Sequence, residues 1–227
     1  MKLLAVIVPA KDEEATIGEL LGRIYSVRVP GYELQTFVVD DGSVDRTAEM
    51  ARKGGATVVS HQHNRGLGAA VRTGLRAAVE AGATAIAYLD ADLEYFPEDI
   101  PRLIEPVLVG RADYVLGSRF RDGVRGMKLH RRLGNYAFTA LLVVLTGRWM
   151  TDGQTGMRAF SREAAGRAEI IHDYNYAQVL TLDLVRKGFR IEEMPIRYQI
   201  REHGESFIRW TYPAKVLPAI WRELKSR

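Results

Sequence analysis

Cysteine is absent from this 227-residue chain, and so are several other features that would define a class of function. Without cysteine there are no disulfides and no thiolate metal sites. The longest apolar stretch, residues 136–145, is well short of the roughly 20 residues that span a bilayer. The first residues, MKLLAVIVPAKDEE, have no small-residue cleavage site and run straight into charge, so they predict a first strand rather than a signal peptide.

Two phosphate-binding signatures are also missing. The dinucleotide fingerprint requires G-x-G-x-x-G after the first strand, where this chain has PAKDEE, and there is no Walker loop. The sequence therefore argues against a dehydrogenase and against a P-loop enzyme. Gly66-Leu67-Gly68 does open a predicted helix, whose N-terminus is a place for an anion.

What is present is the composition of an ordinary globular protein, 47% apolar and 26% charged, with a net charge of +4. Between residues 111 and 132 there are seven Lys or Arg and only two Asp. The seven are Arg111, Arg119, Arg121, Arg125, Lys128, Arg131 and Arg132. Such a segment favours an anionic partner, although a solvated basic surface is the alternative. Aromatic residues that would stack on bases are nearly absent there, so we expect no nucleic acid partner.

Apolar periodicity alternates between strand and helix along the first half of the chain. Strands are expected at 3–8, 34–39, 57–60, 85–89 and 114–117, and helices at 13–25, 45–53, 68–81 and 97–108. This order predicts an α/β fold with a mixed, mostly parallel sheet flanked by helices. After residue 123 we expect helices at 129–146, 162–168 and 176–187, strands at 157–160 and 190–196, and a helical stripe from Trp210.

We interpret the chain as one domain, 1–227, with a nucleotide-binding half at 1–122 and an acceptor-side half at 123–227. In a parallel sheet, ligands bind beyond the carboxyl ends of the strands. Four successive predicted strands end in polar loops here: PAKDE, DDGS, HQHNRGLG and DAD. Asp90 and Asp92 are one residue apart and repel each other, which indicates either a bound cation or a solvated turn. The concurrence of four such loops favours a ligand site.

In their order, the motifs resemble those of the inverting family 2 glycosyltransferases with the GT-A fold. The resemblance is greatest to the dolichyl- and polyprenyl-phosphate sugar transferases. The motifs are VIVPAKDEEATI, VVDDGSVDRT, HNRGLGAAVRTG, LDADLEYFPED, VLGSRF, RRLGN, TDGQTGMRAF and REHGES. Together they cover nearly the whole chain.

The resemblance implies a role for each matching position. Residues of the nucleotide site would be Pro9, Ala10, Glu13, Asp40, Asp41, Asp90, Arg201 and Ser206, the last two on a loop that closes over the diphosphate. Asp90 and Asp92 match the DxD motif that binds Mg²⁺ or Mn²⁺, with Glu94 as a third metal ligand where many relatives have Gln. Lys11 and Asp12 depart from the commoner Tyr-Asn, which leaves the donor open between GDP-mannose and UDP-glucose.

The acceptor side carries the arginines that bind a lipid phosphate in this family. Arg119, Arg131 and Asn135 are the predicted acceptor-phosphate residues, and Asp92, Arg119, Arg131 and Asp152 the catalytic set. Asp152 stands alone in TDGQTG, where relatives that attack with a sugar hydroxyl usually carry an acidic pair. A phosphate monoester, with a second pKa of ~6, needs no strong base. We therefore expect a polyprenyl- or dolichyl-phosphate acceptor.

Two other functions stay open: transfer to a carbohydrate hydroxyl with Asp152 as base, and a nucleotide-sugar-binding subunit without turnover. The helix containing YAFTALLVVL and the stripe from Trp210 are suited either to a membrane surface or to packing within the protein. We expect a cytoplasmic protein, peripheral on the membrane face, with a membrane-protein partner or a homodimer as further possibilities. His61, His63 and His203 are expected to be loop residues rather than metal ligands.

Overall fold

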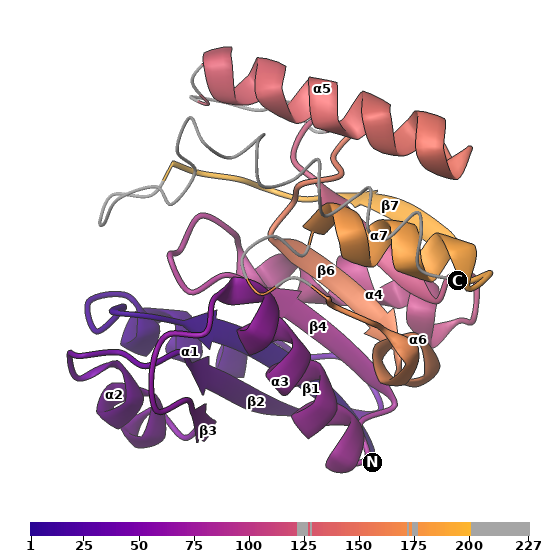
Figure 1. Cartoon of the computed structure of the whole chain (residues 1–227). Helices are drawn as coiled ribbons and strands as arrows, with labels where there is room; N and C mark the ends of the chain where they lie inside the picture. The colour runs from indigo at the N-terminus through magenta and orange to yellow at the C-terminus, as the bar shows by residue number, and fades with distance from the viewer. Residues whose placement is uncertain (122–126, 128, 172, 174–176, 201–227) are drawn as a thin grey trace.

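A seven-stranded sheet organises the computed structural model, which describes residues 1–121, 127, 129–171, 173 and 177–200 (Figure 1). The strands are β1 (Lys2–Ala10), β2 (Tyr32–Asp40), β3 (Thr57–Ser60), β4 (Ala85–Leu89), β5 (Tyr114–Ser118), β6 (Met157–Ser161) and β7 (Ile191–Pro195). The helices are α1 (Ile17–Ser26), α2 (Thr47–Lys53), α3 (Leu67–Glu80), the 3₁₀ turn η1 (Pro97–Asp99), α4 (Ile100–Leu108), α5 (Leu129–Thr146), α6 (Arg162–Arg167) and α7 (Ala177–Arg186). The predicted elements within these residues are confirmed; the stripe from Trp210 lies outside them.

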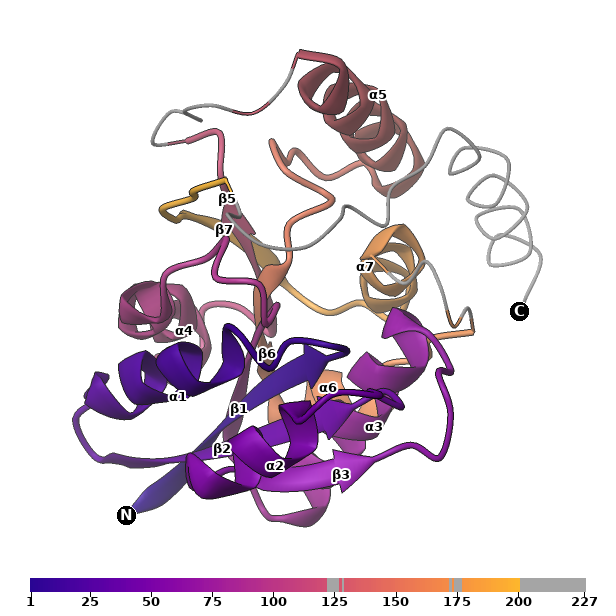
Figure 2. The same cartoon turned by 90° about the vertical axis from the view of Figure 1, so that its left-hand side faces the viewer.

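Helices cover both faces of the sheet, which explains why the central strands are apolar on both sides. Along β1, Leu4, Val6 and Val8 pack with α1, α2 and α4 in one core cluster. Ala5 and Ile7, on the opposite face, pack with α3, α6 and α7 in a second cluster. In Figure 2, α1 and α4 lie on one side of the strands and α3 and α7 on the other.

One strand runs against the others. The sheet order is β3-β2-β1-β4-β6-β5-β7, and β6 is antiparallel to both β4 and β5, whereas the other neighbouring pairs are parallel. An antiparallel strand begins where its parallel neighbours end. Because Met157 pairs with Leu89, the segment 151–156 before β6 lies at the carboxyl ends of β4 and β5. Residues from both expected halves of the chain thus lie at the same end of the sheet, where β4 and β5 terminate.

Helix α5 lies beyond this end of the sheet, apart from the strands (Figure 1). Its Phe138, Leu141 and Leu145 pack on Leu182 of α7, and Leu142 reaches the second core cluster. Within the residues that the structure describes, no helix is both long and apolar enough to cross a bilayer.

Candidate active site

The loops after β1 and β2 are joined to each other by hydrogen bonds. The amide of Asp12 donates to Ser43 Oγ (3.0 Å), and the amide of Val44 donates to Asp12 Oδ1 (2.9 Å). Asp12 has a positive φ of 55°, and α1 starts only at Ile17. The helix expected from residue 13 is therefore shorter, because residues 11–16 are part of this joined loop. Pro9 and Ala10 end β1 beside it.

The two aspartates at the end of β2 face different partners. Asp40 Oδ1 accepts from the amide of Ser43 (3.0 Å). Asp41 is buried, and its oxygens accept from the amides of Arg65 (2.9 Å) and Gly66 (2.8 Å), while His61 Nδ1 lies 2.7 Å away. Asp41 thereby holds the loop before α3 in place. The predicted loop character of His61 agrees with this contact.

The aspartates that follow β4 form a strained electrostatic pair. The Asp90 side chain is partly buried, and its Oδ1 accepts from the Tyr88 hydroxyl. Burial and the neighbouring Asp92 carboxylate raise the pKa of Asp90 to about 7. Asp92 Oδ1 accepts from the Glu94 amide (3.1 Å) across a turn in which Leu93 has a positive φ of 59°.

This pair fits a divalent cation that takes its other ligands from a substrate. Two neighbouring carboxylates that repel each other are suited to a hard cation such as Mg²⁺ or Mn²⁺. In the described part of the chain, no three Asp, Glu or His side chains converge as a metal cage. Mg²⁺ typically uses one or two carboxylates together with substrate phosphates, so the donor set here is adequate for that mode.

The loop 151–156 packs directly against Asp90. A Cβ on Gly156 would lie 1.8 Å from Asp90 Oδ2 and 2.9 Å from Tyr95 Cε2, so only glycine fits. The Gly156 amide donates to the Tyr95 hydroxyl (2.7 Å). The second glycine of TDGQTG, Gly156, is therefore required by the close approach of this loop to the aspartate pair.

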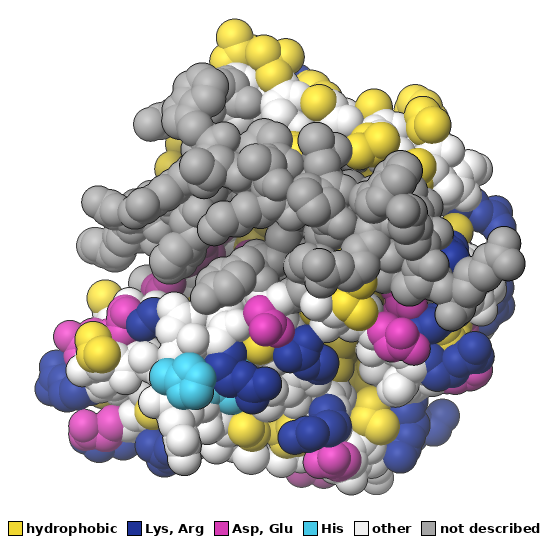
Figure 3. All heavy atoms as spheres, in the orientation of Figure 1, with side chains coloured by type: hydrophobic (Ala, Val, Ile, Leu, Met, Phe, Trp, Pro, Cys, Tyr) yellow, Lys and Arg dark blue, Asp and Glu magenta, His cyan; other side chains and the backbone are white. Residues whose placement is uncertain are grey.

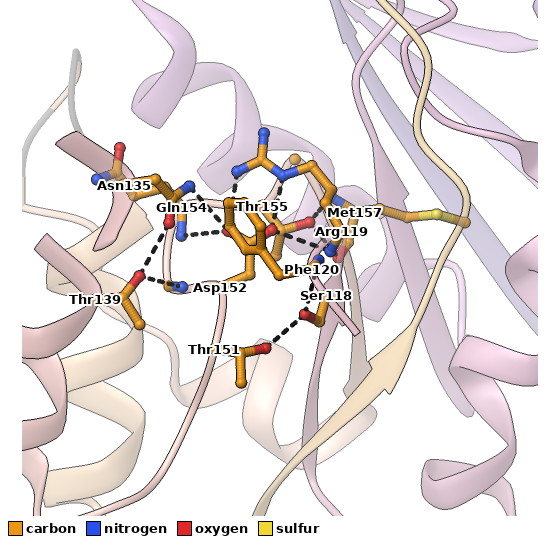
Figure 4. Close-up of polar contacts among 12 residues, drawn as sticks. Ser118, Arg119, Phe120, Asn135, Thr139, Thr151, Asp152, Gln154, Thr155 and Met157 are labelled. Carbon is orange, nitrogen blue, oxygen red and sulfur yellow. Dashed lines mark hydrogen bonds and ion pairs between the residues drawn. The ribbon is translucent and has the colours of Figure 1, made fainter. Parts of the chain in front are cut away.

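A buried ion pair ties the end of β5 to the same loop (Figure 4). Arg119 Nε and Nη2 donate to Asp152 Oδ2 (2.7 Å) and Oδ1 (2.9 Å), and Asp152 is fully buried. Asn135 Nδ2 from α5 donates to Asp152 Oδ1 (3.1 Å), and Thr139 donates to Asn135 Oδ1 (3.0 Å). The amides of Arg119 and Gln154 also donate to this carboxylate. Three predicted site residues thus form one network.

Arg131, also on α5, faces the other predicted acid. Its Nη1 lies 3.9 Å from Glu94 Oε1, an atom that is buried and has no hydrogen-bond partner. Burial, followed by the charge of Asp92, raises the pKa of Glu94. Tyr198 lies nearby, with its ring 5.4 Å from the Arg119 guanidinium.

The segment after β7 is fastened to the turn that carries Glu94. Tyr198 pairs with Tyr95 in an isolated bridge, and the Gln199 amide donates to Glu94 O (2.9 Å). Gln199 Nε2 donates to Leu93 O (2.7 Å). Arg201 and Ser206, predicted to close over the diphosphate, follow this segment and lie outside the described residues.

Two further residues of the site, Glu193 and Arg158, are absent from the predicted set. Glu193 in β7 accepts from the amides of Thr151 and Asp152, each at 2.8 Å, and so holds the loop from below. Arg158 in β6 is fully buried; it donates to the carbonyls of Thr155 (3.0 Å) and Gly153 (3.3 Å) and to the Tyr114 hydroxyl. An arginine inside a strand pattern was the only available hint.

Some arginines of the basic segment 111–132 are already paired with carboxylates and are less available to bind an anion. Arg111 is paired with Glu105 (2.9 Å) and Glu192 (3.1 Å), and Arg119 with Asp152. Arg125 and Lys128 lie outside the described residues. Arg131 is therefore the member of this segment that combines a place in the site with a loose contact.

Known proteins resemble this chain in sequence and in fold. The model of "Glycosyl transferase family 2" matches residues 5–167. The dolichyl-phosphate hexose transferase of Haloferax volcanii is 34% identical over 87% of this chain and 83% of its own length. The undecaprenyl-phosphate mannosyltransferase of Micrococcus luteus is 31% identical over 91% of this chain and 87% of its own.

A solved structure gives the same fold. Glucosyl-3-phosphoglycerate synthase from Mycobacterium tuberculosis, in complex with Mn²⁺, UDP and phosphoglyceric acid, superposes with a TM-score of 0.80 at 22% identity, covering 100% of this chain and 80% of that one. The family match spans most of the chain, and the predicted resemblance is confirmed. This protein belongs to glycosyltransferase family 2 and is a glycosyltransferase with the GT-A fold.

Proposed function

We propose that this enzyme transfers a hexose from a nucleoside diphosphate sugar, GDP-mannose or UDP-glucose, to a polyprenyl or dolichyl phosphate, with Mg²⁺ or Mn²⁺ bound at Asp90 and Asp92. The observation that carries the proposal is the state of Asp152. Its carboxylate is fully buried and accepts three hydrogen bonds from Arg119, one from Asn135 and one from the amide of Gln154.

A carboxylate held in this way is a poor general base. Taking up a proton would neutralise Asp152 and leave the Arg119 guanidinium buried without its counter-ion, which is strongly unfavourable. An acceptor whose nucleophile is a sugar hydroxyl needs a base within hydrogen-bonding reach. A phosphate monoester is already ionised at neutral pH, so it attacks without one.

The nucleophile then needs cations to hold it. Arg131 is about a quarter exposed and has a guanidinium whose planar donors suit phosphate oxygens. The guanidinium of Arg119 stays hydrogen-bonded to Asp152. We therefore propose that Arg119 and Asn135 position the acceptor site rather than bind the phosphate directly. The relatives named above act on dolichyl phosphate and undecaprenyl phosphate, which supports a phosphate-bearing acceptor for this chain.

On the donor side, we propose that the base and ribose lie against the joined loops after β1 and β2. Pro9, Ala10, Glu13 and Asp40 border this place, and Asp41 acts by holding the loop before α3. A cation at Asp90 and Asp92, when bound, would stabilise the charge that develops on the departing nucleoside diphosphate. Arg201 and Ser206 remain predicted contacts of that diphosphate.

The lipid part of the acceptor requires an apolar surface near Arg131. Helix α5 presents Asn135 and Thr139 to the site and an apolar stripe to solvent, with Leu133 58% and Val144 79% exposed. Trp149, just after the helix, is 85% exposed. Figure 3 shows hydrophobic side chains gathered over this end of the molecule. With Arg132 and Arg148 beside the stripe, we propose that α5 lies on an anionic membrane surface during transfer.

The decisive experiment is a transfer assay with two classes of acceptor. Purified protein is incubated with labelled UDP-glucose or GDP-mannose, Mn²⁺ or EDTA, and either geranyl phosphate or octyl glucoside. We expect a labelled product only when both geranyl phosphate and Mn²⁺ are present, and a large loss of this transfer activity in Arg131→Ala. Transfer to octyl glucoside would favour the hydroxyl-acceptor alternative, whereas donor binding with neither transfer nor hydrolysis would favour a binding subunit.

A further inference from the structure

A cavity of about 260 Å³ lies where β5, β7 and the segment after α5 meet. Arg121, Arg148 and Trp149 line it together with the buried Leu116 and Met150. Among the described residues that line it, none belongs to the set predicted for the donor, the cation or the acceptor phosphate. A ligand in this cavity would therefore be additional to the donor and the acceptor.

The two arginines of the cavity have hydrogen-bond donors to spare. Arg121 Nη1 donates to the Glu193 carbonyl (2.6 Å), which holds its guanidinium against β7. A guanidinium has five N–H donors, so most of those on Arg121 stay available. Within the part of the chain that the structure describes, no carboxylate forms an ion pair with Arg121 or with Arg148. The cavity thus holds two positive charges without counter-ions among these residues.

The two glutamates that also line the cavity are engaged with other partners. Glu192 pairs with Arg111 (3.1 Å), and Glu193 accepts from the amides of Thr151 and Asp152, each at 2.8 Å. Their negative charges are directed to these groups, whereas the arginine donors are not satisfied by them. The cavity therefore favours an anion with several acceptor oxygens, and planar guanidinium groups suit those of phosphate.

The size and surroundings of the cavity fit a phosphate group on a small head group. Its volume is below the roughly 300–1,000 Å³ of sites for drug-sized ligands, which argues against a second nucleotide sugar. Trp149 is 85% exposed, and Val144 on the preceding helix is 79% exposed. Tryptophan is enriched where proteins meet the interface between membrane and water. The cavity therefore combines phosphate-binding side chains with a membrane-type surface.

We propose that this cavity binds the phosphate group of an anionic membrane lipid, or of a small soluble phosphate ester, between Arg121 and Arg148. The lipid form of this inference rests on the membrane contact proposed for α5, whereas the soluble form does not. A bound head group fixes α5 at the membrane surface by a specific contact, in addition to the general attraction of basic residues to anionic lipid. Arg131 does not line the cavity and stays available to the acceptor phosphate.

The first test uses a soluble probe. Glycerol 3-phosphate or neutral glycerol is titrated at constant ionic strength into wild type and into Arg121→Gln/Arg148→Gln. The readout is the indole NMR signal of Trp149, assigned with Trp149→Phe. We expect a saturable shift with glycerol 3-phosphate only, and its loss in the double variant, because the two guanidinium groups bind the phosphate. Both arginines are exposed, so the variant should keep its fold.

The second test uses vesicles of phosphatidylcholine with and without phosphatidylglycerol. By flotation, we expect Arg121→Gln/Arg148→Gln to bind the phosphatidylglycerol vesicles roughly tenfold more weakly than wild type, since each basic residue at an anionic surface strengthens binding. Lys2→Gln/Arg52→Gln is the charge-matched control. These residues start β1 and lie in α2, far from α5 (Figure 1), so screening should keep the change below about twofold.

The two tests distinguish the sources of the phosphate. Weaker flotation of the cavity variant than of the control supports a lipid head group, whereas an indole shift with equal flotation supports a soluble ester. Equal flotation without any indole shift would overturn the inference. Transfer to geranyl phosphate is measured separately without vesicles; if transfer fails in wild type while phosphate binding at the cavity persists, only the proposed transfer function falls.

Discussion

The guanidinium of Arg119 and the carboxylate of Asp152 meet through two short hydrogen bonds, 2.7 and 2.9 Å, where β5 ends and the loop before β6 begins. The Asp152 side chain is fully buried, and the Arg119 side chain is only 7% exposed. The pair joins two segments that are 33 residues apart in the sequence, and Asn135 adds α5 to the same junction. This side of the candidate site is therefore built around a neutralised ion pair.

Removing the Asp152 carboxylate should lower the free energy of unfolding of the protein. In Asp152→Ala the buried Arg119 charge loses its partner, and breaking one side of a buried pair typically costs about 3–5 kcal/mol. Urea denaturation should report this loss in the free energy of unfolding. Asp113→Ala is the control, because its bidentate pair with Arg190 is on the surface and should be worth less than about 1 kcal/mol. An Asp152→Ala protein of native stability would contradict the structural role assigned here.

Adding one methyl group at Gly156 should disrupt the cation site. The Cβ of Gly156→Ala would overlap Asp90 Oδ2 at 1.8 Å, so either the loop or the aspartate must shift. We expect at least a tenfold weaker Mn²⁺ affinity, as when a neighbour that positions a ligand is lost. Calorimetric titration measures it. Gly22→Ala is the matched substitution: its Cβ meets nothing within 4 Å on α1, and it should stabilise the helix by roughly 0.5–1 kcal/mol.

Cation binding should depend on pH around neutrality. In the metal-free protein, burial and Asp92 raise the pKa of Asp90 to about 7, with Glu94 adding to the rise and Tyr88 and Arg158 opposing it. The ionised form predominates above this pKa and the protonated form below it, and a cation binds only the ionised form. The apparent Mn²⁺ affinity should therefore be about tenfold weaker at pH 6 than at pH 8. Asp92→Ala should lose binding at both values. A flat profile in wild type would argue against a raised pKa of Asp90 in the metal-free protein.

Charging the exposed stripe of α5 should release the protein from membranes. Leu133→Asp and Val144→Asp place carboxylates on side chains that are 58% and 79% exposed, so the fold should tolerate them. Flotation with vesicles containing phosphatidylglycerol should show wild type bound and the double variant mostly unbound. Val109→Asp, at a 59% exposed position after α4, serves as the control and should leave binding unchanged. Equal flotation of all three proteins would remove α5 from the membrane contact.

The strand and helix pattern could be predicted from the sequence because it depends on local periodicity. Within the described residues, β3, β4 and α5 have the expected bounds, and the other elements differ by a few residues at their ends. The larger difference, at the start of α1, arises because the amides of Asp12 and Glu14 bond to side chains of the loop after β2. Such contacts join residues about 30 positions apart and leave no periodic trace.

The polar loops at successive strand ends and the family of the protein could be predicted from the sequence alone, because residue type and order are local properties. The contacts that those residues make with one another depend on the fold. The antiparallel direction of β6 brings Gly156 onto Asp90, and the pairing of Arg119 with Asp152 occupies the one carboxylate that was a candidate base. Whether a charge is free or neutralised depends on partners from distant segments. For Glu94 and Arg131, a separation of 3.9 Å is the physical fact that no sequence pattern contains.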